Sequence, residues 1–135
     1  AVVSRFAVEA EEAPAKVSYL YTDALLGGAQ NMADWEKQEN GLFRFGQGVC
    51  SKRDGLNAKW SVIGSHFALW APKGPSFGKA ELLVDGKTAA IVDLHAESEV
   101  KSQAVYSSEL TSGRHAIVVR TLSPGVPVDS LEVTF

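Results

Sequence analysis

The sequence has a single cysteine, no run of basic residues and no long apolar segment, and each absence excludes a class of protein. Cys50 is the only cysteine among 135 residues, so the chain can form neither an internal disulfide nor a zinc site made of cysteines. The 13 Lys and Arg against 16 Asp and Glu leave no positive stripe that would neutralise nucleic-acid phosphates. The longest apolar runs, AIVV and AAIV, are far shorter than the roughly 18–20 residues that cross a bilayer. We therefore expect neither a nucleic acid nor a membrane as partner.

Signatures of catalysis are also scarce. No order of Ser, His and Asp has the sequence context of a hydrolase, and Cys50 lacks the neighbours of a cysteine nucleophile. Glu97 and Glu99 lie in a segment typical of a solvated connection, whereas glycosidic cleavage requires two carboxyl groups that face each other across a cleft. These observations favour a protein that is not an enzyme.

The composition is that of an ordinary folded domain. The chain is 45% apolar and 21% charged, close to the average of soluble globular proteins. Its length suits a single domain over residues 1–135. Because the sequence starts at Ala1, we expect either the mature form of a secreted protein or a segment of a longer one. The expected location is secreted or the cell envelope (periplasm or cell surface).

Residues 64–86 carry the strongest structural signal. Two strand-like runs, HFALWA and KAELLVDG, flank a turn segment rich in proline and glycine, and a third run, TAAIVDLH, follows at once. Asp85-Gly86 is a dipeptide typical of a tight hairpin. This succession predicts neighbouring antiparallel strands.

Further strands are predicted along the rest of the chain. Apolar and polar residues alternate over the segments 56–63, 103–107, 114–121 and 129–135. In the same pattern, His115 alternates with Ile117 and Val119, which predicts an inward-facing, hydrogen-bonded core histidine. About eight or nine strands without helical crossovers predict an all-β fold, an antiparallel β-sandwich of jelly-roll type.

The first 55 residues are less regular. Alternation predicts strands over 4–10 and 17–22 and a short strand over 41–46. Between them, Asn31 with Asp34 favours either a short helix that continues through Trp35 or a long surface loop. Residues 23–55 are therefore expected to be irregular or loop-rich.

The segment of about residues 56–135 resembles the galactose-binding-domain-like β-sandwiches. In that family an aromatic strand leads into a Pro-x-Gly-Pro turn and an Asp-Gly hairpin, and a Gly-x-His strand follows later. The matching residues here are Gly64, Phe67, Leu69, Pro72, Gly74, Pro75, Gly78, Ala80, Leu82, Val84, Asp85 and Gly86, then Leu110, Gly113, His115, Ile117 and Val119. The resemblance implies a carbohydrate-binding or accessory module attached to a secreted glycoside hydrolase or related enzyme.

The same resemblance implies a structural calcium. Some modules of this fold open on an E-A-E segment, and that acidic pair and an acidic residue near the last strand hold the metal. In this chain the matching residues are Glu9, Glu11 and Asp129. Side chains two apart on a strand project from one face, and Ca²⁺ takes several oxygen ligands. The alternative is that the two glutamates are only the solvated face of an edge strand.

Tryptophans and loop side chains are the candidate sugar contacts. A sugar ring stacks its C–H face on an aromatic ring, and its hydroxyls need polar partners. Trp60 is interpreted as core, which leaves Trp70 and Trp35 as stacking platforms and Asn40 and Asp54 as hydrogen-bonding residues. The alternatives are tryptophans covered within the structure and ordinary turn chemistry.

The sequence therefore predicts a non-catalytic, carbohydrate-binding-like accessory module of a secreted multidomain protein, with a glycan or polysaccharide as partner and calcium as the candidate cofactor. The alternative is a structural or protein-interaction module of the same fold, without a sugar site, that packs on a neighbouring domain of the same protein. An open groove with an aromatic floor favours the first, and an exposed apolar patch without a polar rim favours the second.

Overall fold

The computed structural model describes residues 15–26 and 32–135, and in this part of the chain strands greatly outnumber helices. The strand expected over 4–10, with Glu9 and Glu11, lies outside the described residues. The elements follow one another as β1 (Lys16–Leu20), α2 (Tyr21–Leu26), η1 (Met32–Asp34), β2 (Trp35–Glu39), β3 (Gln47–Ser51), β4 (Asn57–Ile63), β5 (His66–Lys73), β6 (Lys79–Val84), β7 (Lys87–Asp93), β8 (Val100–Glu109), β9 (Arg114–Thr121), β10 (Pro127–Val128) and β11 (Ser130–Thr134).

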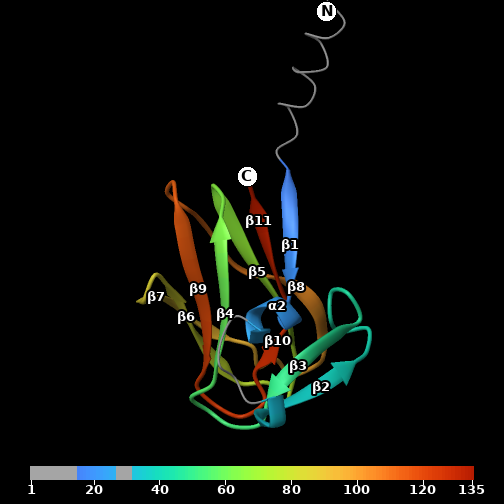
Figure 1. The fold of residues 1–135 in the computed structure, drawn as a ribbon. Coiled ribbons are helices and arrows are strands. Elements are labelled where there is room, and N and C mark those ends of the chain that lie inside the picture. Colours follow the sequence, from blue (N-terminus) through green and yellow to red (C-terminus); the bar gives the residue numbers. More distant parts are fainter. Residues whose placement is uncertain (1–14, 27–31) are drawn as a thin grey trace, which may run out of the picture.

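The strands form two stacked layers (Figure 1). One layer is a sheet of strand order β1-β11-β5-β8, and the other is a sheet of order β4-β9-β6-β7. A smaller sheet, β10-β3-β2, continues from the first layer because β10 runs into β11 with only Asp129 between them. All strand pairs are antiparallel. The predicted antiparallel β-sandwich is confirmed.

Alternate side chains of the two sheets build the core between the layers. β4 contributes Ala58, Trp60 and Val62, whose intervening neighbours are more exposed, and β5 and β11 contribute apolar side chains from the opposite layer. Trp60 is 2% exposed, and its indole N–H donates to the Leu20 carbonyl at 3.0 Å. The predicted core position of Trp60 is confirmed, and its polar atom is satisfied, as a buried indole requires.

The hairpin between β6 and β7 forms where the sequence predicts it. Asp85 and Gly86 have φ angles of 53° and 83°, the left-handed backbone that a tight hairpin needs at both central positions. The Asp85 carboxylate accepts two hydrogen bonds, one from Nδ1 of the His115 ring at 2.6 Å and one from the Ala116 amide at 2.9 Å. His115 also hydrogen-bonds the Thr111 carbonyl at 2.8 Å, so its predicted hydrogen bonding is confirmed. Its predicted core position is wrong, because His115 is only half-buried and lies outside the core cluster.

Two expectations for the first third of the chain are wrong, and the strand expected over 17–22 is confirmed as β1 with an earlier end. The segment over 41–46 is not a strand but the turn between β2 and β3. Phe43 is 1% exposed because its ring packs against this turn's own hairpin, and Gly46 has a left-handed φ of 80°. The strand over 17–22 ends at Leu20, where Asp23 accepts the Leu20 amide at 2.9 Å and so caps the start of α2. Residues 23–55 hold the paired strands β2 and β3, so Trp35 begins a strand and not a helix.

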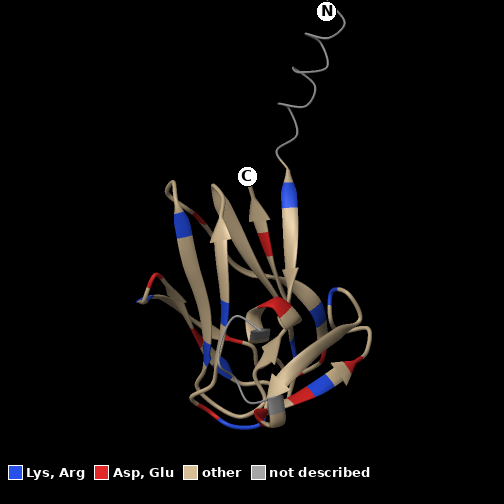
Figure 2. Ribbon diagram, viewed as in Figure 1, with Lys and Arg blue, Asp and Glu red and all other residues tan. Residues whose placement is uncertain are grey.

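Charges are mixed over the molecule, with Lys and Arg interspersed among Asp and Glu on several strands (Figure 2). Within residues 15–26 and 32–135, no helix has the length and apolarity needed to cross a membrane.

Candidate functional site

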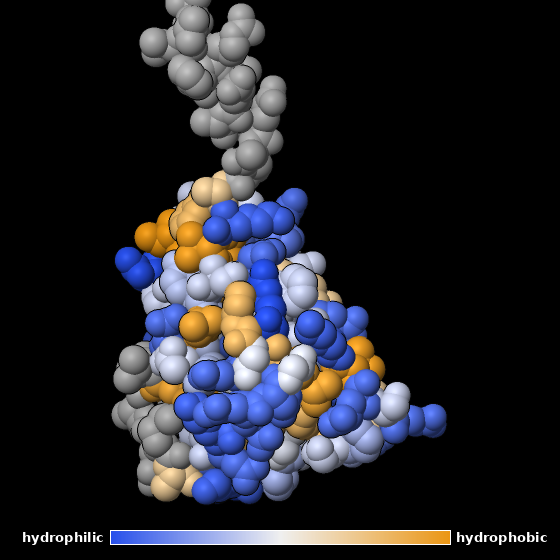
Figure 3. All heavy atoms as spheres, turned by 90° about the vertical axis from the view of Figure 1, so that its right-hand side faces the viewer, coloured by the Kyte–Doolittle hydropathy of each residue, from blue (hydrophilic) through white to orange (hydrophobic). Residues whose placement is uncertain are grey.

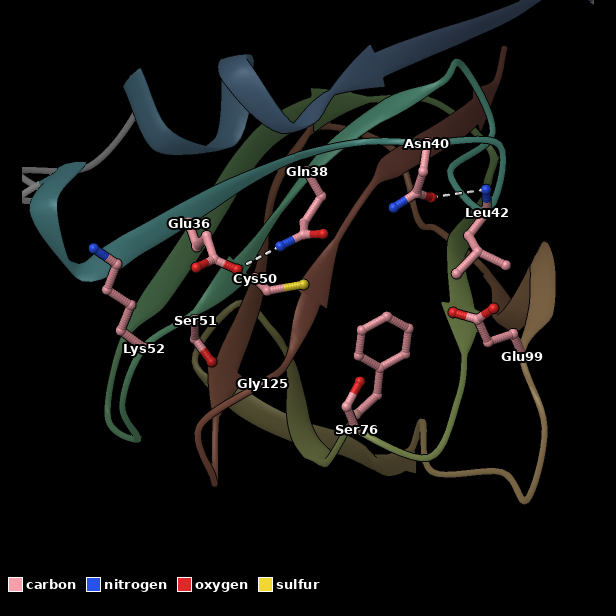
Figure 4. A pocket seen from close by; sticks show the side chains of 11 residues that line it. Glu36, Gln38, Asn40, Leu42, Cys50, Ser51, Lys52, Ser76, Glu99 and Gly125 are labelled. Atoms are coloured by element: carbon pink, nitrogen blue, oxygen red, sulfur yellow. Dashed lines mark hydrogen bonds between the residues drawn. The ribbon is translucent and has the colours of Figure 1, made fainter.

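An open cleft of about 380 Å³ lies where β2, the loop after β5 and the segment before β8 meet. One wall is the solvent-facing row of β2 and its continuation, Glu36, Gln38 and Asn40, which recur at every second position. The opposite wall holds Ser76, Phe77 and Glu99, as Figure 4 shows for the two labelled residues. The floor is made by Cys50, Ser51 and Gly125.

Backbone hydrogen bonds fix the floor of this cleft. The Ser51 amide donates to the Val126 carbonyl at 3.0 Å, and the Gly125 amide donates back to the Ser51 carbonyl at 2.7 Å. The Ser51 hydroxyl accepts the Val126 amide at 3.0 Å and donates to the Ser123 carbonyl at 3.2 Å. The loop before β10 is therefore tied to β3 by both backbone and side chain.

Gly125 allows two loops to approach each other at the floor. Its φ is 79°, and a Cβ at this position would lie 2.6 Å from the Ser76 carbonyl oxygen. The Gly78 amide donates to the Gly125 carbonyl at 3.3 Å, which joins the same two loops. A glycine is required here because any side chain would push the wall that carries Ser76 away from the floor.

The polar groups on the β2 wall are partly preorganised. The Gln38 side-chain amide donates to Glu36 at 2.5 Å, and the Asn40 side chain accepts the Leu42 amide at 2.9 Å (Figure 4). The Asn40 bond is an Asx-type contact that holds its side chain over the turn. Oxygen acceptors and amide donors thus alternate along one wall, which is the arrangement that hydroxyl-rich ligands require.

The floor of the cleft carries a thiol in a negative environment. Cys50 is 7% exposed, and burial followed by the negative charge of Glu36 raises the pKa of its thiol to about 12. The thiol is therefore protonated at neutral pH and is not a nucleophile.

Only one of the four predicted sugar-binding residues, Asn40, lines the cleft. Trp35 is 4% exposed and belongs to the core, so its ring is not available for stacking. Trp70 is covered by Arg44, whose guanidinium carbon lies 4.1 Å from the centre of its ring. Asp54 lies in the exposed turn between β3 and β4, outside the cleft.

Several cleft residues were missed by sequence reasoning. Glu36 and Gln38 alternate with Trp35 and Lys37 as a strand would have them, but a helix or loop was expected there. Glu99 was expected in a solvent-exposed connecting segment, but its side chain forms part of one wall of the cleft. Phe77 lies within the Pro- and Gly-rich turn, where no platform was sought.

Residues 74–78 read GPSFG and match the G-x-S-x-G pattern of hydrolases, a match that the search for hydrolase context overlooked. The pattern has catalytic meaning when the serine stands on a turn from a strand into a helix. Here the segment joins two strands, β5 and β6. Among the described residues, no histidine forms a hydrogen bond with Ser76. Ser76 is therefore a wall residue of the cleft without the partners of a nucleophile.

Asp129 lies beneath the surface between β10 and β11 and is 1% exposed. One of its carboxylate oxygens accepts the Arg44 amide at 2.9 Å, and the other has no hydrogen-bond partner among the described residues. Burial raises the pKa of this carboxyl above its usual value, while the polar groups of Ser102, Arg44 and Ser130 oppose the rise. Residues 15–26 and 32–135 contain no group of three or more side chains suited to hold a metal.

A second hollow of about 330 Å³ lies between α2 and β4 on the open side of the sandwich. It is lined by Tyr19, Asp23, Lys59, Trp60 and Ser61. The Asp23 carboxylate is occupied by the cap of α2 and the Trp60 indole by the Leu20 carbonyl. This hollow offers fewer unoccupied polar groups than the cleft.

Comparison with known proteins identifies the fold. A family 35 carbohydrate-binding module from Clostridium thermocellum superposes with a TM-score of 0.58 and 17% identity, covering 87% of this chain and 96% of that module. The β-(1,4)-mannanase of Podospora anserina, a GH26-CBM35 protein, gives a TM-score of 0.62 and 13% identity over 91% of this chain and 28% of its own. The chain therefore shares the β-sandwich fold of this carbohydrate-binding module and of part of the mannanase.

Sequence comparison also gives a relative, an enzyme much longer than this chain. The A type blood N-acetyl-α-D-galactosamine deacetylase of Flavonifractor plautii is 25% identical over 95 residues, which is 70% of this chain and 12% of that enzyme. The chain thus spans about an eighth of the length of this relative. No protein-family model matches the chain.

Proposed function

We propose that this chain is a non-catalytic module that binds a glycan in the cleft between β2 and the loop after β5 and holds an attached enzyme near it. The observation that carries the proposal is the cleft itself, an open cavity that combines a half-buried aromatic ring, Phe77, with a row of amide and carboxylate groups. Such a combination of one apolar surface and several fixed polar groups suits a sugar ring. The fold shared with carbohydrate-binding modules supports it.

In the bound state, one face of a pyranose would lie against Phe77. Its hydroxyl groups would donate to the carboxylates of Glu36 and Glu99 and exchange hydrogen bonds with the amide of Gln38. The volume is near the lower end of small-molecule pockets, roughly 300–1,000 Å³, so it suits one sugar unit or a chain end. Few and exposed contacts give weak single-site binding.

The relatives also support a place in a larger, secreted protein. The match covers only 28% of the mannanase and 12% of the deacetylase, so both of these chains are several times longer than this one. N-acetyl-α-D-galactosamine, which the deacetylase acts on by name, supplies a first choice of sugar for testing. Galactosides are suitable probes beside it because another chain with a similar structure is an exo-β-1,3-galactanase.

The test is a glycan array probed with the wild-type chain and with Phe77→Ala and Gln38→Ala. Both variants should lose most of the signal, because each removes a contact made within the cleft. Phe45→Ala is the matched control, since Phe45 is an aromatic side chain 52% exposed that does not line the cleft. Retained binding in Phe77→Ala but not in Trp70→Ala would place the sugar at Trp70 and overturn the assignment to the cleft.

The alternative, an interaction module without a sugar site, requires a broad apolar surface. On the face shown in Figure 3, hydrophobic residues are separated by hydrophilic ones. A chain that melts cooperatively but binds no glycan on the array would favour this alternative.

We also propose that Glu9, Glu11 and Asp129 hold a structural calcium. The buried carboxylate oxygen of Asp129 without a partner supports this proposal, because a buried carboxylate is costly unless it is paired or coordinates a cation. Bound calcium would coordinate this oxygen, balance its charge and join Glu9 and Glu11 to the junction between β10 and β11. Ca²⁺ at about 100 times its Kd should stabilise the fold by about 2.7 kcal/mol.

Thermal melts in CaCl2 and in EDTA test the calcium site. The wild-type chain should melt at a lower temperature in EDTA. Asp129→Asn should lose the response to calcium and melt in EDTA no lower than the wild type, because its buried charge is gone. An identical wild-type melt in both buffers would remove the calcium from consideration.

A further inference from the structure

The cleft carries an excess of negative charge on facing walls. Its lining includes two carboxylates, Glu36 on β2 and Glu99 before β8, and one cation, Lys52. Figure 4 shows the Glu99 carboxylate turned towards the cavity, whereas the Lys52 side chain extends outward, away from Glu99. A ligand that enters between the walls therefore meets carboxylates from both sides.

These two carboxylates are not neutralised by the protein. The ion pairs of the described residues involve neither Glu36 nor Glu99. Lys37, the basic residue nearest in sequence to Glu36, pairs with Glu39 at 3.2 Å instead. Arg53, which follows Lys52, pairs with Asp34 at 3.0 Å. Two cations at this end of the molecule, Lys37 and Arg53, thus have other partners.

The negative field of the wall reaches the floor. The charge of Glu36 contributes, after burial, to the raised pKa of the Cys50 thiol, which lies on the floor of the cleft. An anion placed at the same depth would be disfavoured in the same way, and a cation would be favoured.

We propose that the cleft selects its sugar by charge, so that a sugar with a free amino group binds more tightly than its neutral N-acetylated form and a uronate is rejected. The ammonium group would donate charge-assisted hydrogen bonds to Glu36 or Glu99, which are stronger than those from a neutral hydroxyl or amide. A uronate carboxylate would meet like charges on both walls, and the one cation of the lining, Lys52, extends away from Glu99. The inference rests on the proposed glycan binding and specifies its ligand class.

The experiment compares three probes of one stereochemistry by calorimetry. These are methyl α-D-galactosaminide, its N-acetylated form and methyl α-D-galacturonide, at about pH 6, where an amino group is protonated. The same three forms in the gluco series repeat the comparison in case the galacto ring does not fit. The galactosaminide should bind up to roughly fivefold tighter per carboxylate contacted than the N-acetylated sugar, as an exposed ion pair allows. The uronide should show the weakest binding of the three.

Charge-neutral variants assign the effect to the cleft. Glu36→Gln and Glu99→Gln keep the size of each side chain and should each reduce the preference for the amino sugar, and the double variant should abolish it. Glu109→Gln is the matched control, because Glu109 is an exposed carboxylate at the end of β8 outside the cleft. Raising the salt from about 0.15 M to roughly 1 M should shrink the preference in the wild type and in Glu109→Gln, whereas the double variant should show no preference at either salt concentration.

The outcomes separate this inference from the proposed function. Equal affinity for the amino and N-acetylated sugars, or tighter binding of the uronide, would overturn charge selection while leaving glycan binding intact. Absence of binding to all probes and to the glycan array would remove the proposed function itself. A preference unchanged in the double variant would locate the effect outside the cleft and overturn the inference.

Discussion

Arg44 shows how a single side chain decides the role of a tryptophan. Its guanidinium carbon lies 4.1 Å from the ring centre of Trp70 and 5.0 Å from that of Phe45, and it pairs with Glu132 at 2.9 Å. The side chains of Arg44 and Glu132 are 21% and 19% exposed, so water screens this pair less than an open one. Trp70 therefore makes a cation–π contact with an arginine that is itself held by an ion pair, and this face of its ring is not free to stack on a sugar.

Arg44→Ala should lower the free energy of unfolding by about 1–3 kcal/mol, because it removes the cation–π contact and leaves Glu132 with only the longer pair to Lys16 at 3.9 Å. Urea unfolding measures this change. Arg44→Lys should recover part of the loss, since it keeps the charge without the planar fork. Acrylamide quenching should rise in Arg44→Ala through Trp70, because Trp35 and Trp60 are buried. Unchanged quenching would contradict the stacking.

The pair of Asp85 and His115 should make stability depend on pH. The hydrogen bond between His115 and Asp85 is the main cause that raises the pKa of His115 above 6.5. The same bond is the main cause that lowers the pKa of Asp85 below 3.8. The stabilisation from His115 is full below about 6.5 and is lost as the pH rises through its raised pKa. The stabilisation from Asp85 is present above about 3.8 and is lost as the pH falls through its lowered pKa.

The melting-temperature difference between wild type and His115→Gln should therefore be largest between about pH 4 and 6.5 and should decrease towards alkaline pH. His66→Gln is the control, since the His66 ring forms no hydrogen bond in the described part of the chain. A difference for His115→Gln that stays constant up to alkaline pH would show that the pair is not charged.

At the scale of elements, backbone conformation rather than packing limits the β6–β7 hairpin. Gly86 has a φ of 83° with open space around a Cβ, so an alanine there meets no clash but must adopt a left-handed backbone. Gly86→Ala should cost about 1–2 kcal/mol in urea unfolding. Gly41→Ala is the control, because Gly41 also has open space but no left-handed φ. It should be neutral or stabilise by about 0.4–1 kcal/mol. Equal losses in the two variants would contradict a backbone origin.

The strands that sequence reasoning predicted well are those with one face in the core. β4 and β9 alternate because every second side chain packs between the layers, and the Asp-Gly turn fixes the register of β6 with β7. β2 escaped prediction because Trp35 is its single buried side chain, so its polar side chains lie on both faces and apolar residues do not recur at every second position. Phe43 led to the opposite error, a strand predicted where the chain turns. Its side chain is buried because the turn places its ring over Gly48, not because it belongs to a sheet.

The site was less predictable than the fold for a related reason. Asn40 was recognised by its residue type, but its neighbours in the cleft come from four separate segments that only the sheet order brings together. Trp35 and Trp70 were chosen as exposed aromatics, and their surroundings depend on partners distant in sequence, such as Arg44 for Trp70. Residue type predicts chemistry, whereas exposure follows from the tertiary arrangement.

At the scale of the whole molecule, Ala15 and Phe135 lie at the end of the sandwich opposite the cleft. Lys16 pairs with Thr134, and the Phe135 amide donates to the Ala15 carbonyl at 2.9 Å. The residues that line the cleft instead include Ser76 and Phe77, which follow the C-terminal end of β5, and Gly125, which precedes β10. Figure 1 shows that these segments lie away from the start of β1 and the end of β11. An attached domain would therefore leave the cleft facing outward.

This geometry predicts that two copies joined in tandem will both bind. With a flexible linker, the second binding step becomes intramolecular, and retention on an insoluble polysaccharide that the single chain binds should increase by about a hundredfold or more. Pull-down isotherms of the single and the tandem chain measure the increase. A tandem in which one copy carries Phe77→Ala is the control and should bind as the single chain does. If the full tandem also binds no better than the single chain, the cleft is obstructed by fusion at the chain ends, and an outward-facing cleft is contradicted.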